Sequence, residues 1–131
     1  VKMSPTDWSS VELTLGRHTF QKGDVILREG DICNELFFLE SGLLRYFTLR
    51  NGDEVTKFFT DAPYVFTSQK SFTERKAAPE SIEALEDSVI WSMSHAAAHE
   101  LLEIRAWADF VRSLVMEVQH YTEALLLEMQ T

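Results

Sequence analysis

Few residues in the sequence could carry chemistry, and their spacing favours no catalytic site. His95 and His99 stand four residues apart, a spacing that places both on one face of a helix and could supply two zinc ligands. No third ligand stands beside them, so we expect a surface pair and no metal site. The single cysteine, Cys33, is flanked by Asp31 and Glu35, and acidic neighbours disfavour a reactive thiolate.

Motifs of the common enzyme classes are missing from the sequence as well. It contains no Gly-x-Ser-x-Gly elbow, no P-loop and no dinucleotide fingerprint. The enzymatic alternative is a cupin-type metalloenzyme, whose site needs a His-x-His pair, a glutamate and a further histidine in a close group. The four histidines stand apart, at His18, His95, His99 and His120. We therefore expect no enzymatic activity.

Charge and composition limit the partners of the chain. Its 131 residues carry a net charge of −9, from 12 Lys and Arg against 21 Asp and Glu. Nucleic acids and anionic membranes are held by clustered cations, so we expect this chain to bind neither by itself. The length allows one domain with a modest extension. One cysteine suits a reducing compartment and no apolar run reaches membrane-spanning length, so we expect a cytoplasmic protein.

The elements that must position these residues begin with antiparallel β-structure. All five glycines lie in the first 52 residues, at intervals of 7 to 12 residues between β-rich runs. Asn51-Gly52 stands between two such runs and predicts a hairpin, because a type I′ turn needs positive φ at both central residues. After a short helical start we expect a less regular segment over 61–79 and strands over 17–21, 25–28, 35–40, 43–49, 54–60, 81–85 and 89–93.

The last third of the chain lacks glycine and is rich in Ala, Leu, Glu and Met, which predicts helix. We expect Ser94 to cap a short helix over 95–103, followed by a longer helix from about 104 to 130. Apolar residues in the longer helix alternate steps of three and four, as in the seam of a coiled coil. We expect a dimer interface there; the alternative is that the seam packs on the β domain of its own chain. The interface residues are Trp107, Val111, Leu114, Val118, Tyr121 and Leu125.

The order and spacing of four segments carry a family resemblance. The segments are 22–31 (KGDVILREGD), 36–45 (LFFLESGLLR), 50–55 (RNGDEV) and 81–88 (SIEALEDS). Together they resemble the cyclic nucleotide-binding domain of bacterial Crp/Fnr-type transcription regulators. The resemblance implies a mostly-β fold with flanking helices, in which an eight-stranded antiparallel β-roll of jelly-roll type is followed by a long C-terminal helix. It assigns residues 1–103 to a sensor domain and 104–131 to a dimerisation helix.

Regulators of this kind continue into a helix-turn-helix domain that reads DNA. The sequence begins at Val1 rather than at Met and ends at Thr131, where such a domain would begin. We therefore expect DNA binding only through a domain that follows this chain in the full gene product. The alternative is a free-standing sensor.

The resemblance also implies where a ligand would bind. In the family, a short helix after the sixth strand offers its amides to the cyclic phosphate, an arginine completes the charge, and the Glu of a Gly-Glu pair takes the ribose hydroxyl. Here Thr67 and Ser68 stand about where Gly-Glu is expected, and 77–80 holds no arginine. An arginine–phosphate bond contributes roughly 1.5–3 kcal/mol. Losing both anchors predicts cyclic nucleotide binding weaker by roughly two to four decades.

We therefore expect weak or absent binding of cAMP and assign no cofactor. Arg75 and Lys76, just upstream of the gap, either reach in from a shifted loop or are solvated charges. The expected function is effector sensing and homodimerisation, with an unknown small molecule inside the roll. The phenylalanines suit a flat or apolar ligand; alternatively they fill the roll, and the domain is a ligand-free interaction module. The candidate ligand-binding residues are Arg45, Tyr46, Phe58, Phe59, Phe66, Thr67, Ser68, Gln69, Lys70, Ser71 and Arg75.

Overall fold

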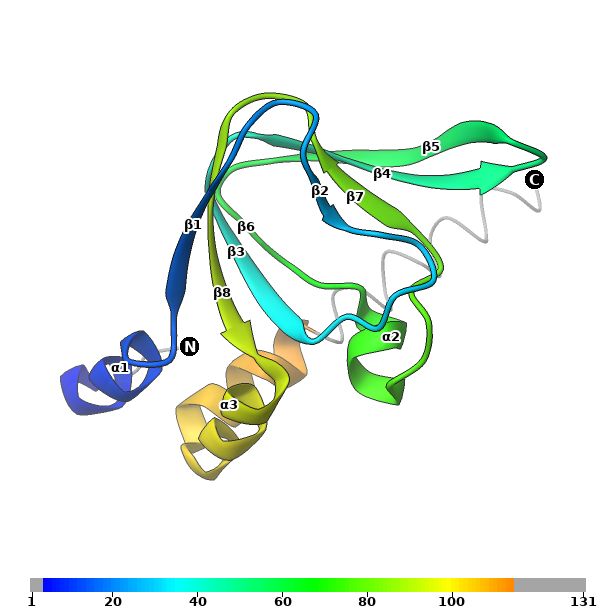
Figure 1. The fold of residues 1–131 in the computed structure, drawn as a ribbon. Coiled ribbons are helices and arrows are strands. Elements are labelled where there is room, and N and C mark those ends of the chain that lie inside the picture. Colours follow the sequence, from blue (N-terminus) through cyan, green and yellow to red (C-terminus); the bar gives the residue numbers. More distant parts are fainter. Residues whose placement is uncertain (1–3, 115–131) are drawn as a thin grey trace, which may run out of the picture. The chain divides into compact units, whose positions relative to one another are not determined.

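The computed structural model describes residues 4–114, whose contacts divide into two compact units (Figure 1). One unit runs from Thr14 to Ala98, and the second is built from the segments before and after it. Within the described residues, no helix has the length and apolar character that a membrane span requires.

Within residues 4–114, eight strands form two four-stranded sheets that face each other (Figure 1). All of their pairings are antiparallel. The predicted mostly-β, eight-stranded roll is thereby confirmed. Sheet A has the order β1 (Gly16–Phe20), β8 (Ser88–Ser94), β3 (Glu35–Ser41), β6 (Tyr64–Phe66). Sheet B has the order β2 (Val25–Leu27), β7 (Ser81–Ala84), β4 (Leu43–Arg50), β5 (Asp53–Asp61).

The β4–β5 hairpin turns at Asn51-Gly52, as predicted. The φ angles are 53° at Asn51 and 85° at Gly52, so both central residues are left-handed, as a type I′ turn requires. The two strands stay paired from Arg50 opposite Asp53 to Leu43 opposite Asp61. This long hairpin carries several of the predicted site residues.

The segment expected to be less regular contains one strand and one helix. β6 pairs with β3 and places Phe66 opposite Phe37, and α2 (Gln69–Glu74) follows almost at once. β6 has 3 residues and α2 has 6. Neither is long enough to show the periodicity from which strands and helices are recognised in a sequence.

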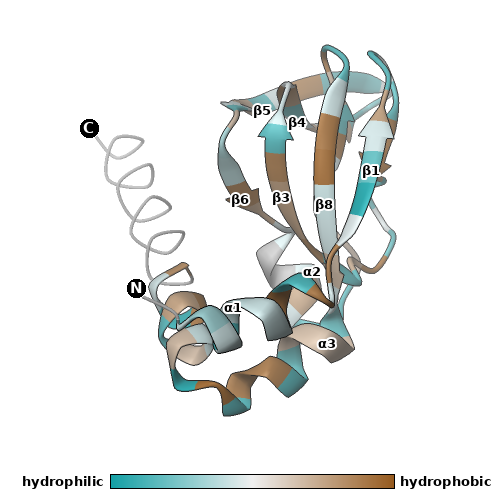
Figure 2. Cartoon of the chain, turned by 90° about the vertical axis from the view of Figure 1, so that its left-hand side faces the viewer, coloured by the Kyte–Doolittle hydropathy of each residue, from teal (hydrophilic) through white to brown (hydrophobic). Residues whose placement is uncertain are grey.

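The interior of the roll is aromatic and aliphatic. Alternation along β4 turns Leu44 and Tyr46 inward, since successive residues of a strand point to opposite faces. Figure 2 shows hydrophobic stretches on β3 and β8 of sheet A. The buried core consists of Leu27, Cys33, Phe37, Leu39, Leu44, Tyr46, Phe66, Ala78, Ile82, Ala84 and Ile90.

Helices begin where the sequence supplies caps. α1 (Pro5–Glu12) starts with Pro5, and the Ser4 hydroxyl accepts from the Asp7 amide at 3.1 Å. α3 (His95–Glu100) is capped in the same way, as predicted, because the Ser94 hydroxyl accepts from the Ala97 amide at 3.1 Å.

The helix expected over 95–103 is two elements in the structure. A 3₁₀ turn, η1 (Leu101–Glu103), follows α3, and Ile104 is extended with φ −82° and ψ 114°. Helical backbone resumes over 105–114. The longer helix therefore begins one residue later than predicted, after the break at Ile104. Of the predicted interface residues, Val118, Tyr121 and Leu125 lie outside the described part of the chain.

Candidate functional site

Polar side chains gather inside the roll beside the aromatic core. They come from β4, from the loop before β3, and from the stretch between β6 and β7 that contains α2. Four of them are at most 3% exposed, and the remaining two are half-buried. Burial of this degree requires that the polar atoms find partners within the protein. We call this group the interior polar cluster; it consists of Cys33, Tyr46, Thr67, Ser68, Ser71 and Glu80.

A serine–glutamate pair brings a negative charge into this cluster. Ser68 stands at the N-cap of α2, but its side chain makes no capping hydrogen bond. Its hydroxyl donates to Glu80 Oε1 at 2.9 Å instead. Ser68 is only 1% exposed and Glu80 is half-buried, so this hydrogen bond is partly shielded from solvent. Glu80 is absent from the predicted site; its only sequence signal is that an acidic residue stands in 77–80, where the family pattern has an arginine.

Hydrogen bonds around Cys33 connect the α2 stretch to the start of β3. The Cys33 amide donates to Ser71 Oγ at 2.7 Å. The Thr67 hydroxyl donates to the Glu35 carbonyl at 2.8 Å, and Cys33 Sγ lies 3.3 Å from both that carbonyl and Thr67 Oγ1. These bonds hold the predicted residues Thr67 and Ser71 in place. A movement of α2 would therefore be felt at the loop before β3.

Tyr46 supplies a protonated phenol to the cluster. Burial raises the pKa of Tyr46 well above its ordinary value, and the charges of Tyr64, Glu80 and Cys33 raise it further. The phenol is therefore neutral at physiological pH and retains its hydrogen-bond donor.

Aromatic rings form a wall next to the polar cluster. Tyr46 stacks on Phe58 with 4.2 Å between ring centroids and meets the edge of Phe66 at 6.4 Å. Phe66 stacks in turn on Phe37 at 4.9 Å. The structure thus brings the predicted residues Tyr46, Phe58 and Phe66 together.

Thr60 adds an unsatisfied hydroxyl to this inner face. It lies two residues beyond Phe58 on β5 and opposite the inward-facing Leu44, so it shares their face of the sheet. Thr60 is 9% exposed, and its Oγ1 has no hydrogen-bond partner among the described residues. Sequence reasoning missed Thr60, because a threonine within a strand carries no signal of its own.

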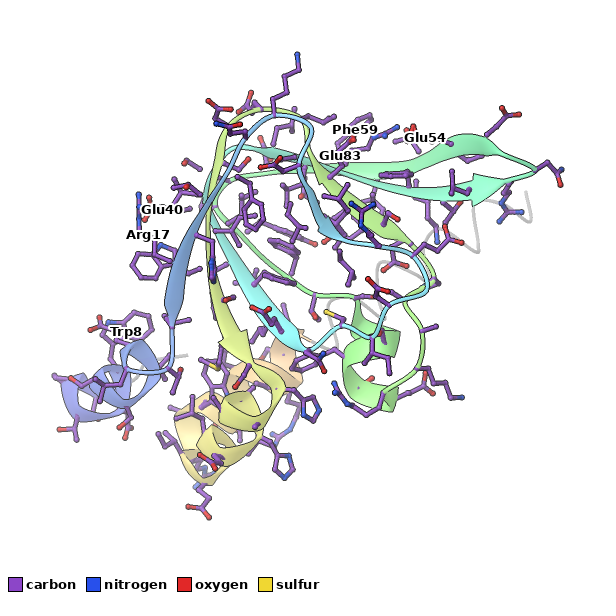
Figure 3. All side chains as sticks on the ribbon, in the orientation of Figure 1. Trp8, Arg17, Glu40, Glu54, Phe59 and Glu83 are labelled. Atoms are coloured by element: carbon purple, nitrogen blue, oxygen red, sulfur yellow. The ribbon has the colours of Figure 1, made fainter. Side chains whose placement is uncertain are left out.

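Two predicted residues lie on the opposite face of sheet B. Arg45 and Phe59 are register partners, and alternation turns both away from the interior that Tyr46 and Phe58 face. Phe59 is 59% exposed. Figure 3 shows it on the outer side of the sheet, together with Glu54 and Glu83.

Arg45 has its own partners on this outer face. Its Nη2 donates to Glu83 Oε1 at 2.9 Å and to Glu54 Oε1 at 3.2 Å. Its guanidinium lies 4.2 Å above the centroid of the Phe47 ring. The Arg45 charge is thus neutralised by carboxylates outside the roll.

Arg75 binds the loop before β3. It closes α2 in a left-handed conformation with φ 59°, and its Nη1 donates to the Cys33 carbonyl at 3.2 Å. Its Nη2 donates to Asn34 Oδ1. The side chains of Gln69 and Lys70 lie outside what the structure describes.

The described residues of the predicted helix seam differ in their exposure to solvent. Trp107 is 1% exposed within the single chain, and its ring lies 5.4 Å from that of Phe110. Val111 and Leu114 are half-buried. Of the seam residues that the structure describes, these two retain surface for a partner.

Two histidines of the described segment, His18 and His95, contact different residues. His18 Nε2 lies 2.9 Å from Ser92 Oγ, and the His95 ring meets the edge of Phe72 at 4.9 Å. Within residues 4–114, no three His, Cys, Asp or Glu side chains are grouped to hold a metal ion.

Several solved structures are similar to this chain in fold. The catabolite activator protein of Thermus thermophilus matches with a TM-score of 0.80 and 19% identity, over 97% of this chain and 60% of that one. A transcriptional regulator from Thermotoga maritima matches with a TM-score of 0.77 and 18% identity. The match covers 95% of this chain and 98% of that one. The sensor domain of the transcriptional regulator DNR from Pseudomonas aeruginosa matches with a TM-score of 0.76 and 18% identity. The match covers 92% of this chain and 81% of that one.

These similarities concern the fold alone, because the identities are low. The chain spans about 60% of the length of the Thermus protein. No curated protein matches the sequence.

A family is nevertheless shown by the sequence itself. The sequence model of the cyclic nucleotide-binding domain matches residues 17–105, which is well over half of the chain. The match covers every strand of the roll except the first residue of β1, and it includes the whole interior polar cluster. The predicted cyclic nucleotide-binding domain is thus confirmed by the family model, and the predicted similarity to Crp/Fnr-type regulators is confirmed in fold. The chain belongs to the cyclic nucleotide-binding domain family.

Proposed function

We propose that this chain is the effector-sensing and dimerisation domain of a cytoplasmic bacterial transcription regulator, and that its effector is a small molecule bound inside the roll. The observation that carries the proposal is the interior polar cluster, a set of buried hydrogen-bonding side chains next to an aromatic wall in a domain of a ligand-binding family. Small-molecule sites are typically apolar with a few placed polar groups, and this combination has that character.

Tight binding of a cyclic nucleotide is disfavoured by the same residues. Thr67 and Ser68 occupy the stretch before α2, and Glu80 brings a carboxylate to the place where a phosphate would need a cation. Of the described arginines near this stretch, Arg45 is paired with carboxylates on the outer face of sheet B, and Arg75 donates to the Cys33 carbonyl and to Asn34 rather than to Glu80. The effector therefore differs from cAMP in charge.

Signal transmission is proposed to be a shift between two conformations. A ligand that binds one conformation more tightly raises its population. The cluster connects α2 to the loop before β3 through Cys33 and Ser71, so a ligand that displaces α2 also moves this loop. In the proposed regulator, the response is passed to the pairing of the C-terminal helices and from there to the DNA-binding domain.

A ligand-free interaction module is the second candidate function. It is favoured by the direct stacking of the inner rings, since Tyr46 and Phe58 lie 4.2 Å apart and Phe37 and Phe66 4.9 Å apart. Rings that already satisfy one another need no ligand to stabilise the core.

A thermal-shift screen of nucleotides and small metabolites separates these two functions. A ligand that binds only the folded chain raises its melting temperature by mass action. We expect at least one compound to raise it in the intact chain and to lose its effect when Tyr46 is replaced by Leu. If no compound in a broad metabolite set shifts the transition, the interaction module is the better account.

Dimerisation is tested by light scattering. We expect a dimer mass for the chain and a monomer mass for the double variant Leu114→Glu, Val118→Glu, because charges in the seam oppose helix pairing. The control is Ser113→Glu, an exposed neighbour of Leu114, which should remain dimeric. An unchanged mass in the double variant would contradict the dimer.

A further inference from the structure

We propose that the interior of the roll selects its ligand by charge: it accepts a flat neutral or cationic molecule that carries hydrogen-bond donors, and it rejects anions. Glu80 is the residue that sets this preference. The inference rests on the proposed function, because it names the class of effector for the same site.

The charge of the cluster comes from Glu80 alone among the described side chains. Its Oε1 accepts from the Ser68 hydroxyl at 2.9 Å, and Ser68 is 1% exposed. A neutral hydroxyl donor stabilises the carboxylate but leaves its charge uncompensated. Of the two nearby arginines, Arg45 is held by Glu83 and Glu54 on the outer face of sheet B, and Arg75 by the loop before β3.

Electrostatics then separates ligands of opposite charge. An anion that binds beside Glu80 meets a like charge in a partly buried environment, where Coulomb interactions are stronger than in water. An ammonium or amidinium group meets the opposite charge and can replace the Ser68 hydroxyl as the donor to Glu80. A discrimination of about tenfold or more between a cation and an anion of equal size follows from a single charge at this range.

Two further features define the rest of the ligand. Tyr46 and Phe58 stack on each other and Phe66 stacks on Phe37, so a flat molecule would bind by extending these existing stacks. Thr60, on the same inner face, has a buried Oγ1 without a partner among the described residues. A hydroxyl buried in this way can accept a hydrogen bond from a ligand donor and thereby recover the cost of its own burial.

The test compares three indoles that differ mainly in the charge of a two-carbon arm. They are tryptamine, which is a cation at neutral pH, tryptophol, which is neutral, and indole-3-acetate, which is an anion. Dissociation constants are measured by titration calorimetry or ligand-observed NMR on the intact chain and on Glu80→Gln. The matched control is Glu86→Gln, which makes the same change in net charge at an exposed turn between β7 and β8.

We expect the intact chain to bind tryptamine at least about tenfold more tightly than indole-3-acetate, with tryptophol in between. Glu80→Gln should reduce this ratio to within about threefold, and Glu86→Gln should leave it unchanged. Equal binding of the cation and the anion by the intact chain, or an equal effect of the two Gln variants, would overturn the charge rule while leaving small-molecule sensing intact. If none of the three indoles binds at millimolar concentration, the charge rule for flat ligands fails, and the thermal-shift screen alone decides whether the interior senses a small molecule.

Discussion

The Ser68 hydroxyl donates its hydrogen bond to Glu80 Oε1 over 2.9 Å inside the roll, although Ser68 occupies the N-cap of α2. A serine at this place in a helix ordinarily caps the first turn. Here it fixes a carboxylate from a residue twelve positions away. This pair couples α2 to the strand pair that begins at Ser81, and it gives the interior its charge.

Removing the Ser68 hydroxyl should destabilise the fold through Glu80. Ser68→Ala leaves the carboxylate without this donor, and we expect a loss of roughly 1.5–3 kcal/mol in the free energy of unfolding. Glu80→Gln should cost less, since the amide oxygen still accepts from the hydroxyl. Urea unfolding of both single variants and the double variant measures the coupling. Strictly additive losses would show that the two side chains do not interact.

Arg45 should stabilise sheet B by more than a surface ion pair does. The side chains of Arg45 and Glu83 are 16% and 21% exposed, and the guanidinium also covers the Phe47 ring. We expect Arg45→Ala to lose about 1–3 kcal/mol of unfolding free energy, and Arg45→Lys to lose part of this because it lacks the planar fork.

The control for this prediction is the exposed pair Arg112–Asp109, whose side chains are 70% and 45% exposed. Arg112→Ala should change stability by less than about 0.5 kcal/mol. Equal effects of Arg45→Ala and Arg112→Ala in denaturant unfolding would refute the stabilising role of Arg45.

Gly42 is required by a close approach as well as by its backbone. It joins β3 to β4 with φ 122°, and a Cβ at this site would lie 2.0 Å from Ser88 Oγ and 2.9 Å from Ser88 Cα. Gly23 also has positive φ, 92°, but its Cβ would meet nothing within 4 Å. We expect Gly23→Ala to cost about 1 kcal/mol and Gly42→Ala at least about 2 kcal/mol more, measured by urea unfolding. Equal losses would mean that Ser88 moves aside freely.

The raised pKa of Tyr46 predicts a loss of stability at alkaline pH. Above about pH 10 the unfolded chain ionises this tyrosine while the folded chain still keeps its proton, so the unfolded state is favoured increasingly until the folded pKa is reached. Tyr46→Phe should remove this decline, whereas Tyr64→Phe, at a 41% exposed residue, should largely retain it. Unfolding free energies between pH 8 and 11 provide the measurement. A decline of the same slope in Tyr46→Phe would contradict the assignment.

Local signals were sufficient to predict most of the fold. The Asn51-Gly52 turn adopts positive φ at both residues because that dipeptide tolerates it, and Ser94 caps α3 through its own hydroxyl. β6 and α2 could not be predicted, because such short elements show no sequence periodicity. β6 is stabilised by pairing with β3, and α2 by the hydrogen bond between Ser71 and the Cys33 amide.

The site was predictable only in part. Tyr46, Phe66 and Ser68 were expected in the interior and lie there, since the family cassette and the strand pattern both indicated them. Placing Arg45 beside Tyr46 in one site disregarded strand alternation, which sends adjacent residues to opposite faces. Glu80 was not predicted, because its partner Ser68 lies twelve residues away in the sequence. A glutamate that directly follows a proline is also typical of an exposed turn.

We propose that this member of the cyclic nucleotide-binding domain family senses a small molecule other than a cyclic nucleotide, because Glu80 lies in the stretch where an arginine would hold the phosphate and Ser68 stands where a glutamate would take the ribose hydroxyl. Titration calorimetry of the chain with cAMP tests it most directly. We predict no heat of binding at micromolar cAMP. A tight complex with one cAMP per chain would contradict the account.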